Sequence, residues 1–176
     1  RIISLQVAPE SLFVTTPRVV VSALAEDPDK DSIRIIIHWV VKNEVIPDTT
    51  NALDLKRFGL KKNDVITGSA FVDDGEFRSE EFLFELIIAN APPVFTREVD
   101  SVKCIPDSIY YKLPIFDPDE DAITYEILDA PTGIMIDQNT GTIYGSVGEV
   151  TSFEVTIRAT DTDGAYMEAQ FTLTSP

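Results

Sequence analysis

Two short acidic motifs each occur twice in this chain, and they hold the side chains best suited to binding chemistry. Asp27-Pro-Asp29-Lys-Asp31 returns as Asp117-Pro-Asp119-Glu-Asp121, and Asp73-Asp74-Gly75 returns as Asp161-Thr-Asp163-Gly164. The first aspartates of the two motifs lie 46 residues apart in the first copy and 44 residues apart in the second. Because this spacing is nearly equal, the sequence predicts two domains built on one plan.

Calcium is the ligand that these carboxylates would suit. Aspartates at alternate positions can converge when a loop curls, and Ca²⁺ takes roughly six to eight oxygen ligands, several of them carboxylates. The motifs lack the central glycine and the final glutamate of an EF-hand loop, so they are not EF-hands. The candidate metal ligands are Asp117, Asp119, Asp121, Asp161 and Asp163 in the second copy, Asp27, Asp29, Asp31, Asp73 and Asp74 in the first, and Asn90 between the copies.

A second interpretation of the same residues needs no metal. Asp-Pro and Asp-Gly pairs form turns, and aspartate side chains cap turn amides by themselves. Clustered carboxylates would nevertheless repel one another without a cation. If calcium binds, we expect the site formed by Asp117, Asp119, Asp121 and Asp161 to be the better one, and we expect the ion to stiffen the pair of domains.

The segments around these motifs read as β-strands. Phe153, Val155, Ile157 and Ala159 alternate with polar residues, and the alternation resumes over residues 165–173 after the Asp-Gly turn, which predicts a hairpin. No convincing amphipathic helix is present, and residues 52–60 could form a short helical turn at most. Further strand pairs are predicted at 109–116 with 123–128, at 18–25 with 33–41, and at 65–72 with 82–89. Many short strands separated by turns indicate an all-β fold of two tandem immunoglobulin-like sandwiches.

The predicted boundary between the domains is the segment Asn90-Ala-Pro92-Pro93. Two prolines cannot continue a β-ladder, and they favour extended backbone. The predicted domains are therefore residues 1–90 and 91–176, each large enough to bury a core without disulfides. Trp39 lies in the nearly continuous apolar run 33–41 and is expected to be the core tryptophan of a central strand.

The composition limits the classes of partner. The net charge is −16, and residues 91–176 carry 15 acidic but only 4 basic side chains. Such a field repels phosphate backbones and anionic lipid head groups, which disfavours nucleic acid and membrane-surface partners. No apolar run approaches the roughly 20 residues of a membrane-spanning helix. Because the chain begins with Arg1 rather than Met, we expect it to be a segment of a longer, processed protein.

No set of residues suited to catalysis can be assembled. His38 is the only histidine, which leaves no Ser-His-Asp or Cys-His set and no histidine-based metal cluster. Cys104 is the only cysteine and is expected to be a small buried apolar residue. Paired aspartates can serve glycosidases, but these lie in turn motifs at a domain end and not in a cleft. We therefore predict a protein that is not an enzyme.

Tyrosines offer one alternative binding surface. A strip of exposed aromatic rings could stack on sugars, although these residues are scattered over different predicted strands and tyrosine is ordinary at sheet surfaces. The tyrosines are Tyr110, Tyr111, Tyr125, Tyr144 and Tyr166.

The motifs of the second half resemble the cadherin-like, dystroglycan-type immunoglobulin repeat, also known by the name "putative Ig" domain. Tyr144 departs from this family where tryptophan is usual, and Glu120 departs where glycine is common. The first half resembles bacterial Ig-like repeats through Asp27–Asp31, Trp39, Leu53, Leu55, Asn63–Ile66 and Asp73–Gly75. The matching segments of the second half are Pro93–Phe95, Phe116–Asp121, Ile123–Tyr125, Ala130–Asp137, Thr140–Ile143 and Val155–Asp161.

This resemblance implies extracellular or cell-surface placement, with a periplasmic location also open, and a structural or adhesive role. Some members of these families bind calcium and others do not. We therefore predict a non-enzymatic spacer and adhesion or recognition module, flanked by other domains and facing a protein or glycan at a bacterial cell surface. The alternative is a carbohydrate-binding accessory module of a secreted enzyme. A third possibility is periplasmic assembly, in which an exposed edge strand pairs with another chain.

Overall fold

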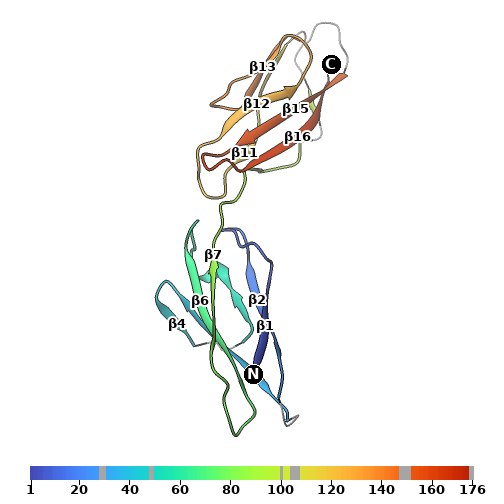
Figure 1. The fold of residues 1–176 in the computed structure, drawn as a ribbon. Coiled ribbons are helices and arrows are strands. Elements are labelled where there is room, and N and C mark those ends of the chain that lie inside the picture. The colour runs from blue at the N-terminus through green and yellow to red at the C-terminus, as the bar shows by residue number, and fades with distance from the viewer. Residues whose placement is uncertain (28–30, 48–49, 100, 104–107, 147–151, 175–176) are drawn as a thin grey trace. The chain divides into compact units, whose positions relative to one another are not determined.

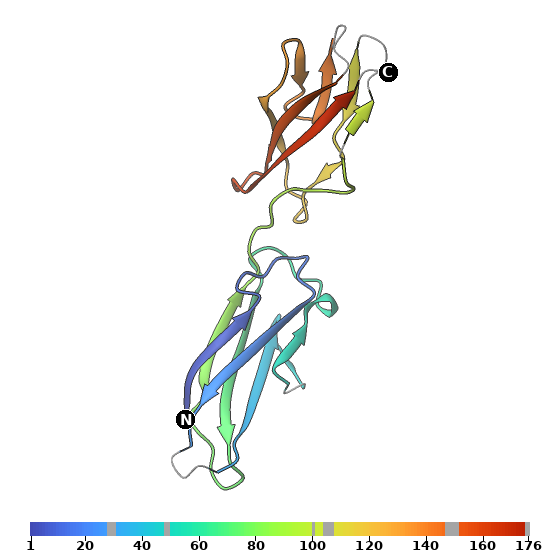
Figure 2. The ribbon, with the colours of Figure 1, turned by 90° about the vertical axis from the view of Figure 1, so that its right-hand side faces the viewer.

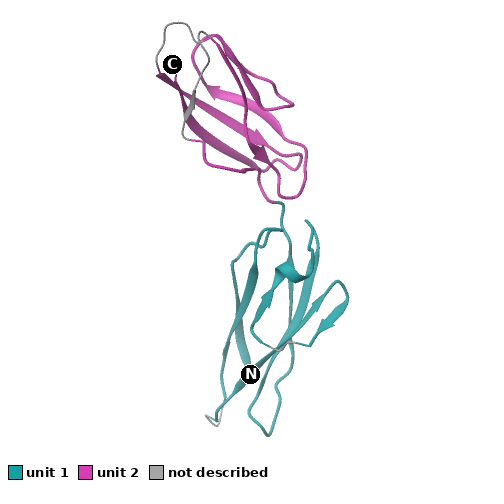
Figure 3. Cartoon of the chain, turned by 180° about the vertical axis from the view of Figure 1, so that it is seen from behind, with its two compact units in different colours: residues 1–90 teal, residues 91–176 magenta. Residues whose placement is uncertain are grey.

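The structure, a computed structural model, describes residues 1–27, 31–47, 50–99, 101–103, 108–146 and 152–174 (Figure 1). The chain divides into two compact units, Arg1–Asn90 and Ala91–Pro176 (Figure 3). Strands build both units, and one 3-10 turn, η1 (Leu55–Arg57), lies within the predicted segment 52–60. In the described residues, no helix has the length and apolar character needed to cross a bilayer.

The first unit contains two antiparallel sheets. One sheet has the order β1-β2-β5, and the other has the order β4-β3-β6-β7. The strands are β1 (Ile2–Ala8), β2 (Arg18–Ala25), β3 (Arg34–Val41), β4 (Glu44–Ile46), β5 (Ala52–Asp54), β6 (Val65–Asp73) and β7 (Phe82–Ile87).

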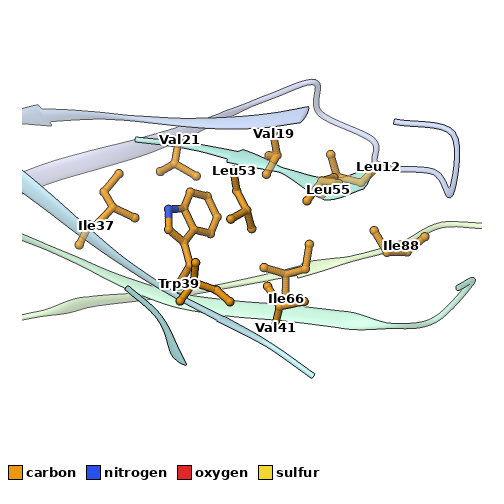
Figure 4. Packing of buried hydrophobic residues seen from close by; sticks show 12 residues of the cluster. Leu12, Val19, Val21, Ile37, Trp39, Val41, Leu53, Leu55, Ile66 and Ile88 are labelled. Carbon is orange, nitrogen blue, oxygen red and sulfur yellow. The ribbon is translucent and has the colours of Figure 1, made fainter. Parts of the chain in front are cut away.

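The core of the first unit lies between these sheets. On β3, Ile37, Trp39 and Val41 are buried while the residues between them face outward. Figure 4 shows Trp39 pointing from β3 toward Val21 and Leu53 of the other sheet. The indole Nε1–H donates a hydrogen bond of 2.9 Å to the backbone carbonyl of Thr50, so the ring is buried without an unsatisfied donor. The prediction of a core tryptophan is confirmed.

The second unit contains two main sheets and a short strand pair. The sheets have the orders β12-β15-β16-β9 and β10-β14-β13, and β8 pairs with β11. All pairings are antiparallel except that of β16 with β9. The strands are β8 (Val94–Phe95), β9 (Ser101–Lys103), β10 (Ile109–Lys112), β11 (Ile115–Phe116), β12 (Thr124–Asp129), β13 (Ile134–Ile136), β14 (Thr142–Gly145), β15 (Ser152–Thr160) and β16 (Tyr166–Thr174).

The predicted hairpin of the second unit is confirmed as β15 and β16 (Figure 2). Val155, Ile157 and Ala159 are fully buried in one core cluster with Phe171 of the same sheet and Ile143 of the other sheet. Alternation with period two therefore places one face of the hairpin in the core, as the sequence indicates. Both units are immunoglobulin-like β-sandwiches, so the predicted fold class is confirmed.

Two predicted strand pairs are wrong, because 109–116 and 123–128 lie in different sheets, and so do 18–25 and 33–41. One predicted strand is also wrong in its extent. The segment 109–116 reads as one strand, but β10 ends at Lys112 and β11 begins at Ile115. Pro114 between them has no N–H to donate to a ladder, and its carbonyl instead accepts from the backbone of Thr96 at 2.8 Å. The chain thus leaves its pairing with β14 and pairs with β8 directly before the acidic loop.

Candidate metal centre

Three aspartates of the loop between β11 and β12 come together in the second unit. Asp117, Asp119 and Asp121 each offer a carboxylate oxygen, and these oxygens all lie within 4.8 Å of one another. The loop curls because Glu120 has a left-handed backbone, with φ of 66°, and donates its N–H to the Asp117 carbonyl at 3.0 Å. Glycine adopts this conformation freely, which accounts for the glycine common at this position in the repeats that the sequence resembles.

Asp117 is the innermost member of the cluster. Only 5% of its surface is exposed. Its Oδ1 accepts the backbone N–H groups of Asp119 and Asp121, at 2.8 Å and 3.3 Å. Its Oδ2 is buried and has no hydrogen-bond partner among the described residues. A buried carboxylate oxygen without a donor is energetically costly, so this atom requires a cation or another donor.

Asp119 repeats this arrangement with a different partner. Its Oδ2 accepts the N–H of Ala91, the first residue of the unit, at 2.7 Å. Its Oδ1 is buried and, within the described chain, has no hydrogen-bond donor. The cluster therefore contains two carboxylate oxygens that protein groups leave unsatisfied, and oxygen is the ligand atom that calcium prefers.

The electrostatics of Asp117 agree with this geometry. Burial raises the pKa of Asp117, the amide hydrogen bonds oppose that rise, and the charges of Asp121 and Asp161 add to it. Removal from water and neighbouring negative charge both disfavour the ionised form. A divalent cation at the cluster would reverse the balance, because it favours ionised ligands.

Asp161 completes the acidic surroundings from the turn between β15 and β16. Its side chain is buried, and its Oδ1 accepts the N–H groups of Asp163 and Ala165, both at 2.9 Å. It lies near enough for its charge to raise the pKa of Asp117, but it is not a member of the three-aspartate cluster. Asp163 is exposed, and it enters this turn through its backbone.

The first unit uses its carboxylates differently. Asp73 forms an ion pair of 2.8 Å with Arg78 and accepts the N–H of Gly75. Asp74 Oδ1 accepts the N–H groups of Glu76 and Phe77, both at 2.7 Å. The pKa of Asp73 is lowered mainly by Arg78, and that of Asp74 is lowered by its amide donors. These carboxylates are satisfied by the turn that they form.

The remaining candidate ligands that the structure describes do not form a cluster of three. Asp27 accepts the N–H of Asp31 at 3.3 Å. Asp29 lies outside the described residues, and so does Cys104. Asn90 is the last residue of the first unit, and it has an interaction of its own. Among the described residues, only Asp117, Asp119 and Asp121 form a group of three that could hold a metal ion.

Two of the tyrosines that the sequence places on different strands lie side by side in the structure. Tyr110 on β10 lies directly opposite Tyr144 on β14, which in turn lies opposite Met135 on β13. Tyr110 is 79% exposed and Met135 is 51% exposed, while Tyr144 between them is half-buried. Strand pairing thus forms a row of three large side chains on the outer face of this sheet. Alternation along each strand could have indicated that these side chains face outward. Only the pairing register of the strands shows that the three side chains lie in one row.

The second unit is similar to a known family of domains. Residues 92–176 match the family model described as "Putative Ig domain". The second unit is therefore similar to this family. The model spans nearly the whole unit, including the loop with the three aspartates and the hairpin of β15 and β16. Among curated protein sequences, none matches the chain.

Solved structures resemble the chain only distantly. Protocadherin gamma B2 extracellular domains 3–6 are 15% identical with a TM-score of 0.45, over 100% of this chain and 50% of that one. The human desmocollin-1 ectodomain is 16% identical with a TM-score of 0.43, over 89% and 36%. A Bacteroides fragilis NCTC 9343 protein described as "a putative alpha-galactosidase" is 16% identical with a TM-score of 0.43, over 49% and 18%. The chain thus spans half or less of each of these proteins, and TM-scores below 0.5 say nothing about its ligands.

Proposed function

We propose that this chain is a non-enzymatic extracellular segment, serving as a spacer and as an adhesion or recognition module, whose second unit binds Ca²⁺ at Asp117, Asp119 and Asp121. One observation supports the proposal of a calcium site. Two buried carboxylate oxygens, Asp117 Oδ2 and Asp119 Oδ1, have no donor in the described chain and lie within a cluster of three aspartates. Turn capping alone uses the other oxygen of each residue and leaves these two unexplained.

The role of the ion in this proposal is mechanical. A bound cation would remove the mutual repulsion of the carboxylates and hold the loop between β11 and β12 in its curled form. Asp119 also accepts the N–H of Ala91, so the ion would fix the residue at which the chain enters the second unit. Calcium would thereby stiffen the entry segment of the unit and the loop together.

Isothermal calorimetry on chelator-stripped protein tests the proposal. Ca²⁺ is expected to bind with saturable heat at one site per chain, and Asp117→Asn should abolish that heat. Asp73→Asn is the matched control, because Asp73 is an acidic turn residue bonded to Arg78, and it should leave the titration unchanged. If the unsubstituted protein gave no heat at millimolar calcium, the loop would not bind calcium, and its aspartates would only cap the amides of the turn.

A second candidate function is supported by the row formed by Tyr110, Tyr144 and Met135. Sugars stack on exposed aromatic rings, and two tyrosines directly opposite each other on paired strands offer adjoining rings. This row favours a carbohydrate-binding accessory module. A glycan array probed with the chain and with Tyr110→Ala is the test: specific binding lost in the variant supports the module, and an array without specific binding removes it.

A further inference from the structure

The outer face of one sheet in the first unit carries a trough of about 480 Å³. Two rows of paired residues form it: His38, Ser69 and Leu83 in one, and Val40, Thr67 and Glu85 in the other. These rows face away from the core, because the row between them, Trp39 with Gly68 and Phe84, faces inward. The trough exists because the central strand β6 presents only small side chains, Thr67 and Ser69, between larger ones on β3 and β7.

The trough and its surroundings are largely apolar. Leu83 on its wall is 73% exposed. Ile87 on β7 and Val45 on β4 are 53% and 73% exposed, and the pairing register places both on the same outer face. Apolar side chains gathered on one face of a soluble domain are typical of an interaction surface.

The charges at the trough are acidic and uncompensated. Glu81 and Glu85 line it, and no lysine or arginine does. Within the described chain neither glutamate forms an ion pair or a side-chain hydrogen bond. The corresponding sheet of the second unit differs, because Arg158 projects from its central strand β15 and contacts Glu126 at 3.0 Å and Glu168 at 2.6 Å. The second unit thus supplies its own cation in the middle of this sheet. In the first unit Arg34 and Arg78 lie at the end of the sheet near Asp73, and neither lines the trough.

We propose that this trough binds an extended peptide segment of another protein, which places an apolar side chain between Leu83 and Val40 and a lysine or arginine beside Glu81 and Glu85. The volume suits one or two side chains and lies in the range of small binding pockets. The charge selects against a second copy of this chain, because pairing the same face twice would bring the glutamates of both copies together. The proposal does not depend on calcium, whose site is in the other unit.

Nuclear magnetic resonance titration in chelator provides the test. The probe is a capped eight-residue peptide that alternates lysine with leucine, and the matched probe alternates glutamate with leucine. We expect the lysine peptide to produce saturable shifts in the backbone amides of His38, Thr67 and Leu83. The glutamate peptide should produce none.

Variants distinguish this trough from general attraction to an acidic protein. Glu81→Lys with Glu85→Lys should weaken binding by roughly two- to tenfold, as expected for exposed charge pairs. Glu10→Lys with Glu76→Lys changes the net charge equally at exposed residues that do not line the trough, and it should preserve binding. Leu83→Ser should also weaken binding, and because Leu83 is mostly exposed the unit should remain folded.

Three results would overturn the proposal. The first is a titration without shifts at millimolar lysine peptide. The second is equal weakening by the two double variants, which would show attraction to net charge only. The third is a set of shifts at the trough that depends on protein concentration without any peptide, which would identify a second copy as the occupant. A calcium titration on the same sample reports separately on the metal site, so either proposal can fail alone.

Discussion

Each unit gathers aspartates in an acidic loop, but the environments of the carboxylates differ. In the first unit, Asp73 and Asp74 lie in an exposed turn where Arg78 and backbone amides satisfy them and lower their pKa values. In the second unit, Asp117 is buried, its pKa is raised, and one of its oxygens has no donor in the described chain. Burial and the number of donors therefore distinguish the acidic loop that could serve a metal from the acidic turn that satisfies itself.

The largest expected effect comes from core substitutions, which test whether the two units differ in their loops alone or also in their cores. Ile66 and Ile157 are both fully buried on the central strands β6 and β15, so Ile66→Ala and Ile157→Ala remove matched core contacts. Each should destabilise its own unit by about 2–5 kcal/mol. Calorimetric melting follows both units, and the fluorescence of Trp39, the single tryptophan, follows the first. A much smaller cost in one unit would show that the cores differ as well.

Calcium should stabilise the second unit against unfolding and leave the stability of the first unit unchanged. At a calcium concentration about 100-fold above its Kd, binding should stabilise the second unit by about 2.7 kcal/mol. The first unit should melt at the same temperature with calcium and with chelator, as read from Trp39 fluorescence. Asp117→Asn should remove the calcium-dependent shift, and Asp73→Asn should keep it. A shift of equal size in both units would contradict the contrast between their loops.

The pH dependence of the calcium-free protein should differ in direction between the units. The pKa of Asp117 is higher in the folded state than its ordinary value of 3.8, so the folded second unit binds that proton more readily. Its contribution to stability is present below pH 3.8 and is lost as the pH rises through the folded pKa. Acidification from neutral pH toward 3.8 should therefore stabilise the second unit in chelator. Asp117→Asn should remove this gain; a gain that persisted in the variant would implicate another group.

The smallest effect should come from the ion pair of the first unit. The pKa values of Asp73 and Asp74 are lowered from 3.8, so their stabilising contribution is present above pH 3.8 and is lost as the pH falls through their folded values. Asp73→Asn should lower the melting temperature of the first unit only slightly, because its partner Arg78 is exposed and water and salt screen the pair. Melting at low and high salt measures the difference, and a large, salt-independent loss would mean that the turn is held by more than this pair.

The sequence alone predicts much of this fold for local reasons. Alternation with period two is a property of each strand, and it correctly predicts the hairpin of β15 and β16. The nearly continuous apolar run 33–41 correctly predicts the burial of Trp39. The break at Pro114 was missed, because an apolar run does not reveal that its two halves pair with different strands.

For the candidate site too, local features could be predicted from the sequence and long-range features could not. The convergence of Asp117, Asp119 and Asp121 follows from their spacing in one loop and could be predicted. The unsatisfied oxygen of Asp119 could not, because it depends on Ala91, 28 residues earlier in the chain, which occupies the other oxygen. The alignment of Tyr110 with Tyr144 likewise depends on a register between strands more than 30 residues apart. Long-range pairing, which no local pattern encodes, supplies the part that sequence analysis lacks.

Strand β7 has a further consequence for the solubility of the protein. It lies at the edge of its sheet in the described chain, and five of its six residues, in the segment Phe82-Leu-Phe-Glu-Leu-Ile87, are apolar. A short apolar edge with high β-propensity is the kind of segment that seeds amyloid-like stacking. Glu85 is the single charge within the strand, so we expect it to act as a gatekeeper that keeps copies of this edge apart in concentrated solution.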